Sequence, residues 1–331
     1  MSDLVSGYNI IRKLGEGARS QVYHVVKPET GQVFALKRVI REKHEDCRFL
    51  DQAIREYEVS SRLNHAYLRK AYELKRIRTV LRLSEVQVVM EFVDGVSLDK
   101  HRPDRIDATV ELFLMVAEGL NAMHEDQLLH TDIKPNNILV TADSIVKIID
   151  YGQSCQIGFR KPRIQGTPDY IAPEQVERRH LTKQTDVFNL GATLYWALTG
   201  TAYPTMITKQ GKRSEKADMP KRVPTPQELN PEIPTALSKL VMQSCAHEPS
   251  RRPRDMKEVI SRLEMLHHVL TKRRKAGHDL STAIRDPGDA PPPPEDDAVP
   301  DSDDSYDFSG FIREIVEDEA AARKEKDGEG L

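Results

Sequence analysis

The chain has 331 residues, of which 38% are hydrophobic and 31% are charged, so it is long enough for one large two-lobed domain and has a globular rather than a disordered or membrane-embedded composition. Its net charge of −3 conceals an asymmetry: residues 276–331 hold 17 acidic and 5 basic side chains, whereas residues 1–275 hold 35 acidic and 44 basic ones. We therefore predict a moderately basic body followed by an acidic tail.

The first part of the chain is predicted to be rich in strands. YNIIRKL (8–14), QVYHVV (21–26) and VFALKRVI (33–40) contain many Val, Ile, Tyr and Phe residues, and turn residues separate them. From Leu50 the pattern has helical spacing, which predicts a helix of roughly 14 residues. RTVLRL (78–83) and VQVVMEFV (86–93) are predicted as two further strands. These elements would form a small sheet with one helix.

After Asp94-Gly95 the sequence becomes mainly helical. Segment 107–124 is almost continuously apolar and predicts a helix buried on most sides. SIVKII (144–149) predicts a short strand that ends at Asp150. Further helices are predicted over VFNLGATLYWALTG, TALSKLVMQSCA and DMKEVISRLEML. The expected fold class is α+β, with a small β-rich lobe and a larger, mainly helical lobe.

Beyond about residue 275 the composition changes. DPGDAPPPPEDDAVPDSDDS is rich in Pro and Asp, and cannot bury enough apolar surface to offset the entropy of ordering. Within the acidic tail, apolar residues recur at i, i+3, i+4, i+7 and i+8, which predicts an amphipathic helix over about 307–320. Its apolar stripe is Phe308, Phe311, Ile312, Ile315 and Val316. This tail could dock on its own domain, at the basic run over 69–82, or on a partner; a solvated tail is the alternative.

We expect a cytoplasmic location. The start, MSDLVSGYNI, has no basic segment followed by an apolar one, so no signal peptide is predicted. The most apolar run is interrupted by Glu111 and Glu118, and no segment approaches the roughly 20 apolar residues of a membrane-spanning helix. Cys47, Cys155 and Cys245 are odd in number and widely spaced, which argues against a disulfide framework or a zinc site.

Several polar groups suit phosphoryl transfer, which needs a phosphate cradle, a cation, metal ligands and a group that orients the attacking hydroxyl. The turn from Leu14 to Val22 contains Gly15 and Gly17, whose backbone could approach phosphates, although Ser20 stands where a third glycine would complete the pattern. An ordinary hairpin turn is the alternative. Its place between two strands argues against a dinucleotide-binding turn.

A cation and a metal-binding loop follow. Lys37 lies on a predicted strand, and either Glu56 or Glu58 on the following helix could pair with it. The segment His130-Thr131-Asp132-Ile133-Lys134-Pro135-Asn136-Asn137 places a carboxylate, a cation and a carboxamide together, although a polar turn would look similar. Asp150 ends an apolar strand 18 residues after Asp132, where a ligand for a hard metal ion is expected.

In these motifs the chain resembles the eukaryotic-type (Hanks-type) serine/threonine protein kinases over roughly residues 8–265, and it looks like their soluble bacterial members. The matching segments are GEGARSQVY, FALK, REYEVSSRLNH, VVMEFVDG, HTDIKPNN, DYG, GTPDYIAPE, DVFNLG and PSRRP. The resemblance implies a bilobal protein-kinase fold, with an N-lobe over 1–90, a hinge over 91–95, a C-lobe over 96–275 and the tail over 276–331. It also implies the cofactors ATP and magnesium, or manganese in its place, and protein substrates.

The resemblance assigns roles by position. It favours Glu56 over Glu58 as the partner of Lys37, because the family places this glutamate nine residues before a histidine, here His65. Asp132 would be the catalytic base, and Asn137 and Asp150 would hold the metal. The catalytic set would be Asp132, Lys134, Lys37, Glu56 and Thr167. The ATP-binding set would be Leu14, Gly15, Gly17, Ser20, Val22, Ala35, Lys37, Met90, Glu91 and Val93. Glu174 would pair with Arg252.

The chain departs from the family at several positions. Thr131 replaces an arginine that usually pairs with a phosphate on the activation loop. Ser154 is the only hydroxyl residue between Gly152 and Gly166. We therefore predict that activity does not depend on phosphorylation of this loop. Tyr151 stands where Phe is commoner and adds a hydroxyl that needs a partner if buried. Ser60 is small and polar where a bulky residue is usual, which could loosen the helix that carries Glu56.

The predicted activity is the transfer of the γ-phosphoryl group of Mg-ATP to protein Ser or Thr hydroxyls. Lys134 and Thr167 resemble the serine/threonine branch, with dual specificity as the alternative. A pseudokinase scaffold, which binds nucleotide or partners without turnover, is the competing function, and Thr131 and Ser60 are its only support. GTPDYIAPE argues against a small-molecule kinase, and no motif indicates nucleic-acid binding.

Overall fold

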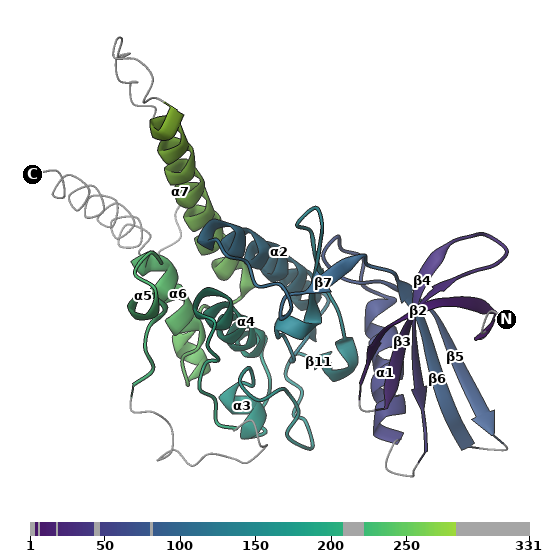
Figure 1. Ribbon diagram of the computed structural model, residues 1–331. Coiled ribbons are helices and arrows are strands. Elements are labelled where there is room, and N and C mark those ends of the chain that lie inside the picture. Colours follow the sequence, from purple (N-terminus) through teal and green to yellow (C-terminus); the bar gives the residue numbers. More distant parts are fainter. Residues whose placement is uncertain are drawn as a thin grey trace, which may run out of the picture.

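The structure is a computed structural model that describes residues 4–5, 7–17, 19–42, 47–79, 82–207 and 222–282, without the side chains of 4–5 and 275–282. It has two lobes, with the strands gathered at one end and most helices at the other (Figure 1). The tail from residue 283 on, including the helix predicted at about 307–320, lies outside the described residues. None of the described helices combines the length and the apolar character needed to cross a membrane.

The smaller lobe is an antiparallel sheet of six strands in the order β1-β2-β3-β4-β6-β5. The strands are β1 (Leu4–Val5), β2 (Tyr8–Glu16), β3 (Ser20–Val26), β4 (Val33–Ile40), β5 (Ala71–Thr79) and β6 (Arg82–Glu91). The single helix α1 (Cys47–Ser60) packs on one face, where its Leu50 and Ala53 meet Ala35, Val88 and Met90 of the sheet. Side chains alternate between the two faces of the sheet along its central strands, so the residues that share one face are buried under α1.

One predicted strand was wrong. The segment 78–83 does not form a strand of its own, because β5 begins at Ala71 and pairs with β6 as far as Thr79 opposite Arg82. The segment therefore covers the closed end of a hairpin, whose residues 80 and 81 are not described. The run from Ala71 to Thr79 mixes apolar with charged residues, and its last four residues are exposed.

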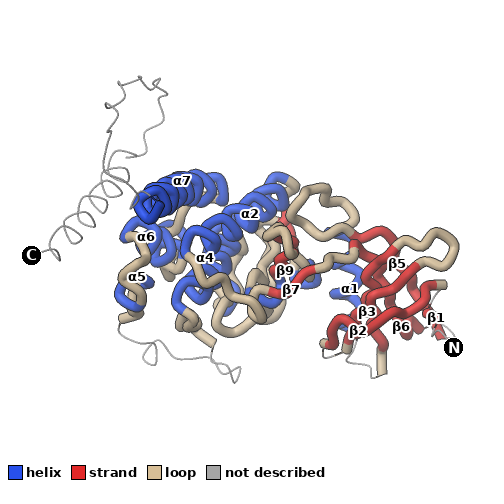
Figure 2. The backbone as a smooth tube through the Cα atoms, turned by 45° about the horizontal axis from the view of Figure 1, so that its top comes forward, coloured by secondary structure: helices blue, strands red, loops and turns tan. Residues whose placement is uncertain are grey.

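The larger lobe is built around α2 (Ile106–Glu125) and α4 (Lys183–Thr199), both buried on most sides. Around them lie α3 (Pro173–Val176), α5 (Pro226–Leu229), α6 (Thr235–Ser244), α7 (Met256–Thr282) and the short helix η4 (Pro249–Arg251). Helix α7 runs alongside α2 in both backbone views (Figures 1 and 2). Gly191 lets α4 approach α6 closely, since an added Cβ would lie 2.5 Å from the Cβ of Ser244.

Short strands and turns join the lobes. Strands β7 (Gly95–Ser97), β9 (Ile138–Thr141) and β10 (Val146–Ile148) form a three-stranded sheet at the junction (Figure 2). Strands β8 (Leu128–Leu129) and β11 (Cys155–Gln156) form a second, two-stranded one. The 3₁₀ helix η2 (Pro135–Asn137) forms the end of the predicted catalytic segment 130–137, and η3 (Tyr151–Gln153) begins directly after Asp150. These irregular segments bring polar side chains between the lobes, as functional loops on a rigid scaffold do.

Candidate active site

The Lys37 side chain of β4 reaches the Glu56 side chain of α1. Their Nζ and Oε2 atoms lie 2.5 Å apart, and Glu56 is fully buried. A second cation, Arg69, donates to the other carboxylate oxygen of Glu56 at 3.0 Å. Glu58, the alternative considered from the sequence, is exposed. The geometry therefore favours Glu56 as the partner of Lys37, and it adds Arg69, which the sequence did not indicate.

Lys37 also faces Asp150 across the junction of the lobes. The Nζ atom lies 3.5 Å from Oδ1 of Asp150, whose side chain is 41% exposed. The Lys37 ammonium holds the pKa of Asp150 at about 2, well below its ordinary value. Burial on its own lowers the pKa of Lys37, but the carboxylates of Asp150 and Glu56 outweigh it and leave that pKa raised. Both groups are thus charged across the neutral range.

Three side chains of the predicted catalytic set form a closed triangle. Lys134 Nζ donates to Asp132 Oδ2 at 2.8 Å and to the hydroxyl of Thr167 at 2.7 Å. That hydroxyl donates to Asp132 Oδ1 at 2.7 Å. Asp132 is only 5% exposed, so both of its oxygens are fixed in orientation. Thr167 comes from a segment 35 residues further along the chain, which links the catalytic loop to the segment before α3.

Asn137 and Asp150 offer oxygen atoms that fit a hard metal ion. The amide nitrogen of Asn137 donates to the backbone oxygen of Asp132 at 2.9 Å, which fixes the amide. Its Oδ1 accepts no hydrogen bond from the described residues. Ionised carboxylate and amide oxygens are the ligands that magnesium prefers. The residues present therefore fit a magnesium ion beside Lys37, held by Asn137 and Asp150.

Asp186 on α4 holds the predicted catalytic loop, residues 130–137, in place. The sequence analysis placed Asp186 in a motif but gave it no role. Its fully buried carboxylate accepts from the backbone N–H groups of His130 at 2.9 Å and Thr131 at 2.7 Å, and lies 2.8 Å from Nε2 of His124. Burial opposes ionisation, yet these bonds leave the pKa of Asp186 lowered. They also hold Thr131 at a left-handed φ of 62°.

The glycine turn and the adenine side of the predicted ATP site lie in the smaller lobe. The N–H of Gly17 donates to the Ser20 carbonyl at 2.7 Å, and a Cβ on Gly17 would come within 2.8 Å of the Ser20 hydroxyl. Residue 18 lies outside the described residues. The apolar candidates are partly exposed at Leu14, half-buried at Val22 and buried at Ala35 and Met90.

In the segment between the lobes, one backbone N–H group forms no hydrogen bond with the described residues. Glu91 ends β6, where its carboxylate pairs with Lys147 at 2.8 Å and its N–H donates to the Lys70 carbonyl at 2.8 Å. Val93 follows outside any strand, and its N–H has no hydrogen-bond partner among the described residues. A purine edge needs such a donor, so the hinge fits a nucleotide base.

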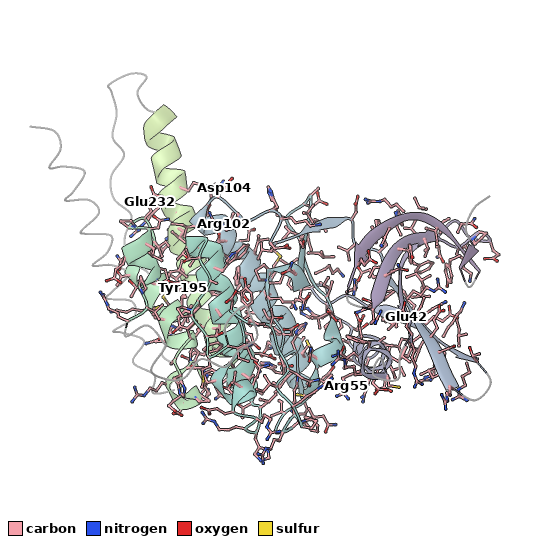
Figure 3. The ribbon with its side chains drawn as sticks, turned by 60° about the horizontal axis from the view of Figure 1, so that its bottom comes forward. Glu42, Arg55, Arg102, Asp104, Tyr195 and Glu232 are labelled. Carbon is pink, nitrogen blue, oxygen red and sulfur yellow. The ribbon has the colours of Figure 1, made fainter. Side chains whose placement is uncertain are left out.

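Two departures from the family, Tyr151 and Ser60, are buried. The hydroxyl of Tyr151 is fully buried and donates to the Ile148 carbonyl at 2.8 Å, which satisfies the need stated above. Ser60 is buried at the end of α1, one turn after the doubly paired Glu56. Arg55 of α1 also donates to the Ser154 carbonyl at 3.4 Å, and it lies where α1 meets the larger lobe (Figure 3). Helix α1 is therefore tied to its surroundings at two residues.

The predicted pair of Glu174 and Arg252 forms a buried, two-pronged ion pair. The Nη1 atom lies 2.7 Å from Oε1 and Nη2 lies 2.9 Å from Oε2. Arg252 donates further bonds to the carbonyls of Ala246, Gln184 and His247. The pair fixes the segment around α3 to the loop before α7.

Comparison with known proteins gives a consistent picture. The family model described as "Protein kinase domain" matches residues 8–268. A probable serine/threonine-protein kinase of Clostridium acetobutylicum is 27% identical over 271 residues, which are 78% of this chain and 40% of that protein. A probable serine/threonine-protein kinase PknB of Lactococcus lactis is 26% identical over 266 residues, covering 77% and 41%. The chain thus spans less than half of the length of these two relatives.

A yeast relative and a solved structure agree with this. The Aurora kinase of Saccharomyces cerevisiae is 31% identical over 199 residues, which are 58% of this chain and 53% of that protein. The crystal structure of the Mycobacterium tuberculosis PknI kinase domain superimposes with a TM-score of 0.60 at 22% identity, covering 80% of this chain and 98% of that one. The predicted bilobal α+β fold is confirmed.

Proposed function

The chain belongs to the protein kinase domain family, and from that premise we propose that it transfers the γ-phosphoryl group of ATP to Ser or Thr hydroxyls of proteins. The relatives named above as serine/threonine kinases support this substrate class. The family uses ATP with magnesium, and the site has the cation, the oxygen ligands and the open hinge donor that such a cofactor needs.

One observation carries the proposal: three separate segments meet, because Lys37 lies 3.5 Å from Asp150, the N–H of Ile149 beside Asp150 donates to the Asn137 carbonyl at 2.9 Å, and the Asn137 amide donates to the Asp132 carbonyl at 2.9 Å. Bound Mg-ATP would supply the phosphoryl group that is transferred. Lys37 would hold phosphate oxygens, while Asp150 and Asn137 would hold the metal. Asp132 would orient the hydroxyl of the substrate and receive its proton, since Lys134 and Thr167 fix both carboxylate oxygens. Glu56 would position Lys37.

Labelled ATP and a panel of proteins test this proposal. We expect Mg-dependent transfer by the full chain, with the label on Ser or Thr after acid hydrolysis. Asp132→Asn keeps the size of the side chain and removes the proton acceptor, so kcat should fall by about 100-fold or more. Asp104→Asn, on an exposed turn before α2, is the matched control and should stay within about twofold of the wild type.

Three outcomes would contradict the proposal in different ways. Label on tyrosine as well would indicate dual specificity. Nucleotide binding without transfer to any protein would favour the pseudokinase scaffold. Equal transfer by the wild type and Asp132→Asn would show that Asp132 has no role in the chemistry.

We also propose that the acidic tail over 276–331 regulates the enzyme or recruits a partner by docking. The support is its charge opposite to that of the basic body and its apolar stripe at helical spacing. A tethered segment has an effective concentration on the order of mM, so a weak contact would suffice. Deleting residues 287–331 tests this, because unchanged kinetics and unchanged partner capture would show that the tail does neither.

A further inference from the structure

Lys161, which the sequence did not single out, lies buried in the segment between the metal-binding loop and α3. Only 5% of the residue is exposed. Its Nζ donates at 2.6 Å to the hydroxyl of Thr131 and at 2.6 Å to the backbone carbonyl of Gln153. One side chain thus joins the activation segment, the residue before Asp132 and the residue after Asp150-Tyr151-Gly152.

The Lys161 ammonium, the Thr131 hydroxyl and the Gln153 carbonyl form a ring of three hydrogen bonds. The Thr131 hydroxyl accepts from Lys161 and donates its own hydrogen to the Gln153 carbonyl at 2.9 Å. In the part of the chain that the structure describes, no carboxylate forms an ion pair with Lys161. Burial lowers the pKa of Lys161, and nearby Cys155, Asp132 and Asp186 offset this only in part. A lysine that is costly to bury is therefore held by two neutral oxygens.

Thr131 departs from the family, and Lys161 is its bonding partner. Where the family has an arginine, this chain has a short hydroxyl side chain, and the cation comes instead from the activation segment. An arginine at position 131 would place a second cation against Lys161. Position 131 also affects the position of Asp132, because the two residues are adjacent and the backbone N–H of Thr131 donates to Asp186.

Phosphorylation could also order the activation segment, but the residues between Gly152 and Gly166 give little support for it. Ser154 is the only hydroxyl residue between Gly152 and Gly166. Its Oγ is buried and has no hydrogen-bond partner among the described residues, and the residue is only 1% exposed. A protein kinase needs its target hydroxyl in an extended, accessible segment, which this arrangement does not offer. Something other than a phosphate must order the segment.

We propose that Lys161 is a positioning residue that orders the activation segment against the catalytic loop, in the place of the phosphate and arginine used by relatives. This inference rests on the proposed kinase function and deepens it. Without the two bonds from Lys161, the segment that carries Thr167 loses one of its anchors beside Asp132, and the bonds of Gln175 to the Thr131 and Gln165 carbonyls remain. The triangle of Asp132, Lys134 and Thr167 would then be populated for less of the time.

Substitutions of the two bonded side chains test this in the full chain. Lys161→Met removes the donor at similar size, and we expect kcat to fall about tenfold while the KM for ATP changes less than about twofold. Lys161→Arg keeps a donor and should restore part of the rate. Gln156→Met, at an exposed position of the same segment, is the control and should keep the kcat of the wild type. Phosphatase treatment should leave wild-type activity unchanged.

A double variant separates this role from a general loss of packing. If Lys161 acts through Thr131, the combined Thr131→Val and Lys161→Met variant should be no slower than the slower single variant. Hydrogen exchange of residues 153–165 should be faster in both single variants than in the wild type, and unchanged in Gln156→Met. The thermal midpoints of all the variants should be similar. Should Lys161→Met not fold, Lys161→Arg and Thr131→Val decide the same question.

The possible failures are distinguishable. If the wild type transfers phosphate, Asp132→Asn does not and Lys161→Met keeps full kcat, the positioning role is wrong while the kinase function stands. If the wild type transfers no phosphate, the hydrogen-exchange data alone test the positioning role of Lys161. Unchanged exchange of residues 153–165 in Lys161→Met would then show that Lys161 does not order this segment. Loss of wild-type activity on phosphatase treatment would also overturn it.

Discussion

The buried hydroxyl of Ser154 separates two explanations of how the activation segment becomes ordered. If phosphorylation were required, Ser154→Ala would abolish activity. Because the Oγ is buried and no described residue bonds it, we expect Ser154→Ala to keep kcat within about twofold and to leave stability equal or raised by about 1 kcal/mol. Steady-state kinetics and the thermal midpoint check this. A loss of more than about tenfold, or about 1.4 kcal/mol of barrier, would contradict it.

At the residue scale, the sequence predicts best where chemistry is concentrated in a short segment. Asp132, Lys134 and Asn137 lie within six positions, so their proximity is almost assured by the chain itself. Spacing and the family pattern together selected Glu56. Arg69 and Lys161 could not be found in this way, because each matters through a contact with a distant segment, and both resemble ordinary surface cations in the sequence.

At the element scale, the position of α1 depends on more than the pair of Lys37 and Glu56. Arg69 lies just before β5, and its guanidinium takes the second oxygen of the buried Glu56. The sequence raised the concern that the small Ser60 would loosen this helix. The extra ion pair lies one turn away from Ser60 and holds the same part of α1.

Arg69→Met tests the contribution of this second cation. Glu56 would keep Lys37 but lose one charged hydrogen bond in a buried setting, so we expect about 2 kcal/mol less stability. We also expect a severalfold lower kcat, since α1 would position Lys37 for less of the time. Arg62→Met, on an exposed position of the same connection, is the control. Urea unfolding and steady-state kinetics measure both effects, and equal behaviour of the two variants would refute this view of α1.

The buried helices of the larger lobe were predictable because their apolar content exceeds what an exposed segment carries. The short helices α3 and α5 were not predicted, and α7 runs to Thr282, 16 residues beyond the predicted segment that ends at Leu266. The segment 107–124 matches α2 (Ile106–Glu125) within one residue at each end. The strand predicted at 78–83 failed for the opposite reason. The edge strand β5 carries many charges, so its sequence resembles a basic loop. The apolar residues Val80 and Leu81 that follow it led to a strand being predicted at 78–83 instead.

At the scale of the whole molecule, the site exists only because the two lobes hold a fixed relation. Lys37 comes from the sheet, Glu56 from α1, and Asp150 from the junction. Periodicity within a segment cannot predict that three such distant residues meet. The family motifs predict it, because their order along the chain identifies a fold in which these positions converge.

The pair of Glu174 and Arg252 joins segments 78 residues apart within the larger lobe. Because both groups are buried, removing one leaves an uncompensated charge or unpaired carbonyls, and we expect Arg252→Met to lower stability by about 3–5 kcal/mol. Glu174→Gln keeps an acceptor and should cost less. The double variant should be less destabilised than the sum of the two, since neither charge then remains alone. Urea unfolding of the three variants measures this coupling, and strictly additive losses would show that the pair contributes nothing beyond its separate contacts.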